Sequence, residues 1–87
     1  MTKWMIVYAS CSETGGLGSS VAFYNTEEEA TKHMKTTYDI IKEDLEGGSI
    51  EWDDYEEGKT YSIGGYNKYV YYNRYEAYIT KINFKEE

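Results

Sequence analysis

The sequence predicts an α+β domain in which one amphipathic helix packs on one face of an antiparallel sheet of four or five strands. Three observations predict it. One long segment has helical periodicity, the segments on either side of it have strand character, and no linker or repeat divides the chain. A chain of 87 residues forms one domain with one modest core, here residues 1–87. The expected order is β-β-α-β-β, and whether a fifth strand follows is left open.

Two strands are expected before the helix. Residues 3–10 place Trp4, Ile6 and Tyr8 on one side of an extended chain, and the residues between them are also apolar. A strand that is apolar on both sides is typical of the middle of a sheet. A glycine-rich stretch then interrupts the pattern, and residues 20–24 resume it. The sequence therefore predicts a hairpin with a long, flexible tip.

The helix is the clearest element in the sequence. Thr26 is a suitable N-cap, and Glu29, three residues later, completes the pattern of a capping box. Apolar residues then recur at spacings of four, four, three and four, which places them in one stripe. These residues are Ala30, Met34, Tyr38, Ile41 and Leu45. The glycine pair at 47 and 48 predicts the end of the helix.

After the helix, three runs have the composition of strands. They are residues 59–63, 68–72 and 75–84. The run 64–67 (GGYN) predicts a turn. Asn73 and Arg74 lack the glycine of a preferred two-residue hairpin turn. The sequence therefore leaves open whether residues 68–84 form two strands or one strand with a bulge.

The negative charge of the chain is local. Residues 43–57 hold eight of its 16 acidic residues and no basic residue, and the rest of the chain has 16 − 8 = 8 acids against nine bases. Nucleic acid and anionic membrane surfaces are not expected as ligands, because phosphate binding needs clustered Lys and Arg. A basic protein surface is the natural complement of such a segment. The alternative is that the acids only keep the surface hydrated.

Aromatic residues accompany this charge. Trp52 and Tyr55 lie inside the acidic segment, and seven of the eleven tyrosines lie between residues 61 and 78. One helix covers one face of a sheet, so some of these rings are expected to be exposed, as at protein interfaces. For Trp52 and Tyr55, the alternative is that they anchor the acidic segment to the core. For the tyrosines of residues 61–78, the alternative is that they serve only as good strand formers. The predicted partner-binding residues are Glu43, Asp44, Glu46, Glu51, Trp52, Asp53, Asp54, Tyr55, Glu56, Glu57, Tyr66, Tyr69 and Tyr71.

No catalytic, metal or cofactor site is predicted. His33 is the only histidine and Cys11 the only cysteine, so neither a zinc site nor an internal disulfide is expected, and a reducing cytoplasm is the predicted location. The acidic segment lacks the spacing of a calcium-binding loop, and no apolar run is long enough to cross a membrane. The stretch 6–16 resembles the first strand and phosphate loop of flavodoxins. A strand-like run follows it where FMN binding needs a helix.

In size, charge and composition the chain resembles small phage-encoded inhibitors of host defence, including anti-CRISPR proteins and other DNA mimics. The resemblance covers no aligned motif. It implies a non-enzymatic inhibitor, in the host cytoplasm, whose carboxylates stand in for phosphates on a basic nucleic-acid-binding surface, such as that of a nuclease or its complex. Two alternatives are a small cytosolic interaction subunit with a solvating acidic loop, and a small-ligand binder that uses the glycine-rich loop 15–18. The sequence leaves the partner, the source and the oligomeric state open.

Overall fold

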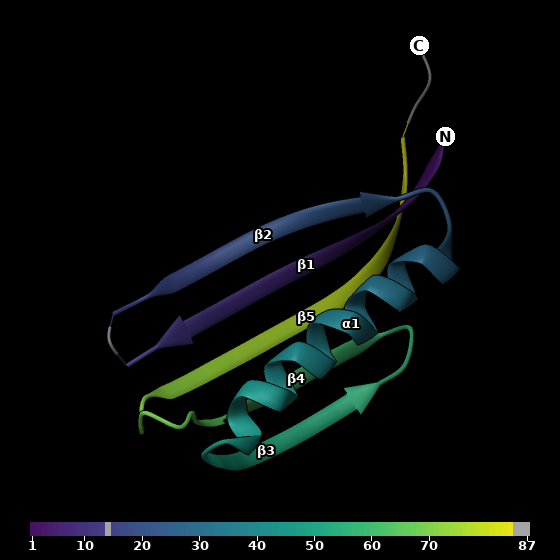
Figure 1. Cartoon of the computed structure of the whole chain (residues 1–87). Coiled ribbons are helices and arrows are strands. Elements are labelled where there is room, and N and C mark those ends of the chain that lie inside the picture. Colours follow the sequence, from purple (N-terminus) through teal and green to yellow (C-terminus); the bar gives the residue numbers. More distant parts are fainter. Residues whose placement is uncertain (14, 85–87) are drawn as a thin grey trace.

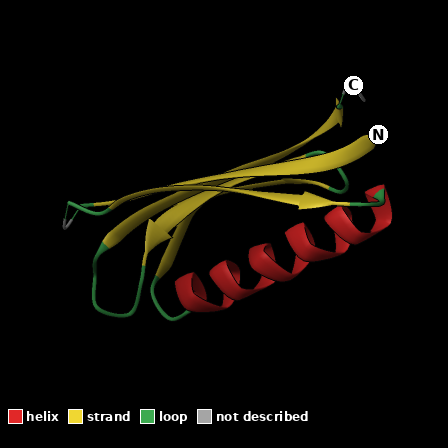
Figure 2. Ribbon diagram, turned by 90° about the horizontal axis from the view of Figure 1, so that it is seen from above, coloured by secondary structure: helices red, strands yellow, loops and turns green. Residues whose placement is uncertain are grey.

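A computed structural model describes residues 1–13 and 15–84, which form a five-stranded antiparallel sheet with one helix across one face (Figures 1 and 2). The elements are β1 (Thr2–Ser12), β2 (Leu17–Tyr24), α1 (Glu27–Glu46), β3 (Ser49–Glu56), β4 (Thr60–Tyr66) and β5 (Tyr72–Asn83). The strand order is β2-β1-β5-β4-β3, so β2 and β3 are the two edges. The predicted α+β class is confirmed, and the sheet has five strands.

The helix begins and ends where its sequence signals place it. The Thr26 hydroxyl accepts a hydrogen bond from the Glu29 N–H at 3.1 Å, and Gly47 caps the other end. The predicted stripe faces the sheet, with Ala30, Met34, Tyr38 and Leu45 buried and Ile41 partly buried.

The core lies between this stripe and the sheet. Ile6 from β1, Ala77 from β5 and Tyr61 and Ile63 from β4 meet the helix there, and all four are buried. Tyr61 and Ala77 are directly opposite in neighbouring strands. Burying a large apolar side chain, such as that of Ile6 or Ile63, stabilises the fold by about 1.5–3 kcal/mol. The opposite face of the sheet has no covering element among the described residues (Figure 2).

The sequence predicts no strand within the acidic segment, but Ser49–Glu56 of this segment form the edge strand β3. A β-bulge between Ile50 and Trp52 shifts the register of β3 against β4. Because of this shift, the sequence does not show the regular alternation of inward-facing and outward-facing residues that is typical of a strand. The turn expected at residues 64–67 is also wrong, since β4 runs through both glycines to Tyr66. Gly64 is needed for space: a Cβ atom there would come within 2.2 Å of the Trp52 indole.

The strand expected at residues 68–72 is a loop instead, and β5 is a single strand that starts at Tyr72. Val70 has a φ of +65°, which no strand residue adopts. The β1–β2 hairpin is longer than expected, with its two strands paired from Trp4 opposite Tyr24 to Cys11 opposite Leu17. The tip is correspondingly short, and residue 14, within it, lies outside the described residues.

Candidate protein-binding site

The structure places the predicted acidic residues on several sides of the molecule. All eight acidic residues of the segment 43–57 are exposed, although the side chain of Asp53 is only 27% exposed. Asp53 points to the helix side of β3, whereas Asp54, its neighbour in the strand, points to the uncovered side. Glu43 lies nine residues after buried Met34, which places it half a turn round the helix and away from the sheet. The acids therefore form separate groups and no single flat surface.

Asp53 has a structural role. Its carboxylate accepts a hydrogen bond from the Tyr38 hydroxyl, and the Lys42 ammonium lies 3.6 Å from its other oxygen. Burial, reinforced by this hydrogen bond, raises the pKa of Tyr38 well above its usual value. Asp53 thus joins β3 to α1, and its charge is partly neutralised within the fold.

Trp52 and Tyr55 are half-buried anchors of β3. The Trp52 indole N–H donates to the Ser62 hydroxyl at 3.1 Å, and the Arg74 guanidinium lies 5.8 Å from its ring. The Tyr55 ring packs against Tyr38 with centroids 4.5 Å apart. Of the two roles that the sequence left open, the geometry favours contact with the rest of the fold over free exposure.

The segment of residues 67–71, called here the tyrosine loop, carries the most exposed aromatic side chains of the candidate set. Tyr69 is 66% exposed, Val70 71% and Tyr71 48%. The loop is closely bonded. The Asn67 side-chain oxygen accepts hydrogen bonds from the Tyr69 N–H at 2.9 Å and the Tyr71 N–H at 3.2 Å. The Val70 N–H also donates to the Asn67 carbonyl at 2.9 Å. Three large side chains are thereby held in solvent by one residue. Tyr66, just before the loop, is half-buried against Tyr72.

Val70 is the one described non-glycine residue with a positive φ. A β-branched residue in the left-handed region is strained, and such strain tends to persist where a functional surface requires the conformation. Its side chain is exposed, so core packing does not explain the choice of valine.

The tyrosine loop lies against the turn between α1 and β3, at one end of the sheet (Figure 1). A Cβ atom at Gly47 would sit 3.3 Å from the Lys68 Cβ, and one at Gly48 would meet the backbone of Tyr66 and Asn67. These segments border a hollow of about 380 Å³ that Val70 also lines.

The same end of the molecule is acidic on balance, although the tyrosine loop contributes Lys68, whose ammonium lies 5.1 Å from the centre of the Tyr69 ring. The last turn of α1 contains Glu43, Asp44 and Glu46 and no basic residue. Carboxylates at a helix C-terminus oppose the negative end of the helix dipole and destabilise the helix by about 0.3–1 kcal/mol each. Exposed Glu51 follows in the bulge of β3. We call this surface, formed by the tyrosine loop with Glu43, Asp44, Glu46 and Glu51, the acidic end.

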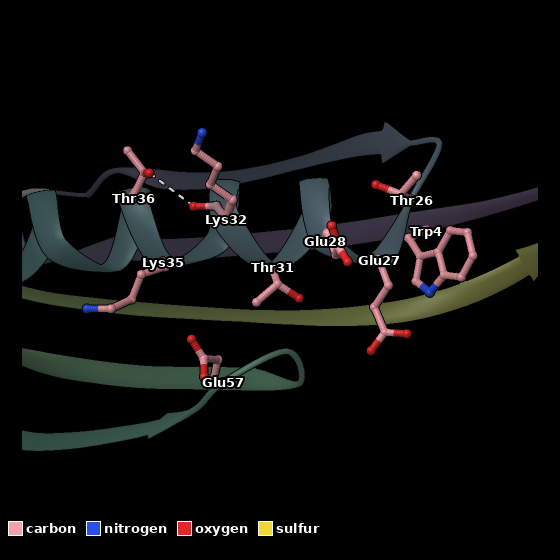
Figure 3. Close-up of a pocket in the computed structure, with 9 residues that line it drawn as sticks. All are labelled: Trp4, Thr26, Glu27, Glu28, Thr31, Lys32, Lys35, Thr36 and Glu57. Atoms are coloured by element: carbon pink, nitrogen blue, oxygen red, sulfur yellow. Dashed lines mark hydrogen bonds between the residues drawn. The ribbon is translucent and has the colours of Figure 1, made fainter.

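A second hollow, of about 910 Å³, lies near the other end, between the first turns of α1 and the β3–β4 turn (Figure 3). Trp4, Glu27 and Glu57 are among the residues that line it. Lys35, also on its wall, is paired with Asp39 at 2.7 Å. The walls carry exposed charges of both signs and no evident nucleophile–base pair. Among residues 1–13 and 15–84, no three of His, Cys, Asp or Glu gather around a metal position.

The glycine-rich tip offers little for a small ligand in its described part. The Ser12 N–H donates to the Gly16 carbonyl at 2.8 Å, and the Gly15 N–H donates to the Ser12 carbonyl at 3.0 Å. These amides close the turn of the hairpin. His33 stacks on Tyr24 with ring centroids 4.7 Å apart, which is a packing role.

Comparison of the chain with protein-family models, with curated proteins and with solved structures gives no match. In the described part of the chain, no helix combines the length and apolarity needed to cross a membrane. The functional interpretation therefore depends on the geometry of the surface.

Sequence reasoning missed Asn67 and Val70. Asn67 carries a signal, because an Asn side chain often bonds to the backbone two residues later in a turn. Val70 carries none, because valine is a strand former and its left-handed conformation is visible only in the structure.

Proposed function

We propose that this protein is a non-enzymatic binding module that docks its acidic end on a basic surface of another protein. The observation that carries the proposal is the tyrosine loop. Asn67 holds Tyr69, Val70 and Tyr71 in solvent, in a strained conformation, beside the acidic C-terminus of α1. Rigid aromatic side chains surrounded by polar groups are typical of the residues that contribute most to protein interfaces.

The charge of this end favours a basic partner. Carboxylates in the last turn of a helix lower its stability, so their placement there is better explained by an effect outside the fold. The negative helix terminus and its carboxylates add to one local field. Such a field speeds the encounter with a cationic partner and weakens as salt is added.

Proteins that bind nucleic acid are the best-matched class of partner, because they present clustered Lys and Arg for phosphates. Carboxylates of the acidic end would occupy some of these cations, as in an anti-CRISPR-like inhibitor. The other carboxylates point elsewhere, so the proposed mimicry extends over a few phosphates rather than a long duplex. The half-buried Cys11 thiol fits a reducing cytoplasm as the site of action.

Charge reversal at the acidic end tests the proposal. A variant with Glu43→Lys, Glu46→Lys and Glu51→Lys removes its field and also improves the helix dipole interaction. We expect this variant to fold at least as stably as the wild type, and to lose capture of its partner in a pull-down from a lysate of the cells in which the protein acts.

The matched control reverses three charges at the opposite end of β3: Asp54→Lys, Glu56→Lys and Glu57→Lys. Net charge changes equally, and capture of the partner is expected to persist. Equal capture by the two variants and the wild type would refute docking through the acidic end. A different result would be that the charge variant still captures the partner, whereas Tyr69→Ala and Tyr71→Ala lose it. That result would indicate an interaction subunit whose acidic residues only keep its surface hydrated.

A further inference from the structure

The two edges of the sheet differ in charge. Edge strand β3 carries Glu51, Asp53, Asp54 and Glu56 and contains a β-bulge. Charges and bulges on an edge strand prevent it from pairing with the strand of another chain. Edge strand β2 has the sequence LGSSVAFY, without charge, proline or bulge. One edge is therefore protected against pairing and the other is not.

Strand β2 is also open on its outer side. All eight of its residues pair with β1 on the inner side, and no described element covers the outer side (Figure 1). Six of the eight residues are exposed. On the helix side the strand ends in Tyr24, and the three residues before it on that side are small: Gly18, Ser20 and Ala22, which leave room for a neighbouring chain.

The distribution of charge along the chain favours this edge as the place where two copies meet. Residues 1–25 carry Lys3 and Glu13, a net charge of zero, so the remaining 62 residues carry the whole −7. Like charges that face each other across paired strands are destabilising. Two copies that met through β3 or the helix would oppose carboxylates, whereas two β2 strands oppose none.

We propose that β2 pairs with β2 of a second copy, in antiparallel orientation, to form a symmetric dimer. The two-fold axis is perpendicular to the sheet, as for any antiparallel pair of identical strands, and keeps both helices on one face. Residues that are opposite each other must then share a face. If the strands pair along their whole length, the axis consequently lies between the two copies of Ser20 or between the two copies of Val21, and the two five-stranded sheets join into one of ten.

An identical strand is the best-matched occupant of this edge. A strand from another protein would gain the same main-chain hydrogen bonds, but the charged surfaces of this chain would attract a cationic partner away from this neutral edge. Self-pairing requires a neutral edge, and it places the two acidic β3 edges at the far ends of the joined sheet. The acidic end stays free in this arrangement.

Sedimentation velocity of the full chain over a range of concentrations tests the dimer. The wild type is expected to show a monomer–dimer equilibrium. Ser20→Glu and Ser20→Lys each place like charges across the axis, and each is expected to raise the dimer dissociation constant about tenfold or more. An equimolar mixture of the two variants is expected to restore dimers, because opposite charges then face each other.

Ser49→Glu, an exposed serine on the other edge, is the control and is expected to leave the dimer unchanged. Circular dichroism establishes that each variant is folded. Three results would overturn the proposal: a wild type that is monomeric up to about 1 mM, a dimer unaffected by both Ser20 variants, or a dimer lost only with Tyr78→Arg on the uncovered face of the sheet.

Discussion

At the scale of single residues, the tyrosine loop depends on one amide. The Asn67 side-chain oxygen accepts hydrogen bonds from the backbone N–H groups of Tyr69 and Tyr71. These bonds take the place of the hydrogen bonds that the two N–H groups would make in a strand. The loop closes over a left-handed Val70. A residue that tolerates this conformation would make the same turn with less strain. The valine therefore lowers the stability of the fold.

Replacing Val70 should therefore stabilise the protein. Asn tolerates the left-handed region, which disfavours valine by about 1–2 kcal/mol. Val70→Asn is expected to raise the free energy of unfolding by about 1 kcal/mol, measured by urea denaturation. Val70→Thr keeps the β-branched shape and is expected to leave stability unchanged. A loss of stability in Val70→Asn would contradict the proposed strain.

At the scale of elements, tyrosines bind the helix to the sheet. Tyr38 and Tyr61 pack together with ring centroids 5.7 Å apart, and both are buried. Burial raises the pKa of Tyr61 from 10.0 to about 12. It also raises the pKa of Tyr75 on β5, to which the charge of Asp44 adds. The interface between α1 and the sheet thus favours the protonated, uncharged form of both tyrosines.

The fold should consequently lose stability in alkali. With a folded pKa of about 12 and an unfolded value of 10.0, the Tyr61 contribution is complete below pH 10.0 and is lost as the pH rises to about 12. The expected loss is about 2 kcal/mol in the free energy of unfolding. Urea denaturation across this range measures it, and Tyr61→Phe should reduce the slope. A wild-type stability that is constant up to about pH 12 would contradict this assignment.

The elements that could be predicted are those with local signals. The helix has its Thr26 cap, its apolar stripe and its terminal glycines, all within 23 residues of one another, and each signal was correct. Strand β3 was missed because the bulge at Ile50 breaks its alternation. Gly64 was assigned to a turn because its actual role, making space for Trp52, depends on a residue in another strand.

The candidate site was predictable to a similar extent. Composition indicated exposed tyrosines, and Tyr69 and Tyr71 are exposed. It could not separate them from Tyr55, which anchors β3, because both kinds of tyrosine occur in polar surroundings. Nor could it show that the carboxylates diverge, since this depends on strand and helix faces rather than on position along the chain.

At the scale of the whole molecule, charge and shape divide the chain into distinct surfaces. The hairpin of β1 and β2 is neutral, whereas α1 and β3 carry most of the acids. Met1 and Phe84, the first and last described residues, lie together at the end opposite the tyrosine loop, where the Phe84 N–H donates to the Met1 carbonyl at 2.7 Å (Figure 1). Neither of these two residues covers the acidic end.

Site-specific photo-crosslinking tests the central claim most directly. A photoreactive phenylalanine analogue replaces Tyr69 in the tyrosine loop in one sample and Tyr78 on the uncovered sheet face in another, and both are irradiated in the lysate. Docking through the acidic end predicts a crosslinked partner from position 69, with a yield that falls as salt is added, and none from position 78. A partner captured from position 78 but not from position 69 would contradict it.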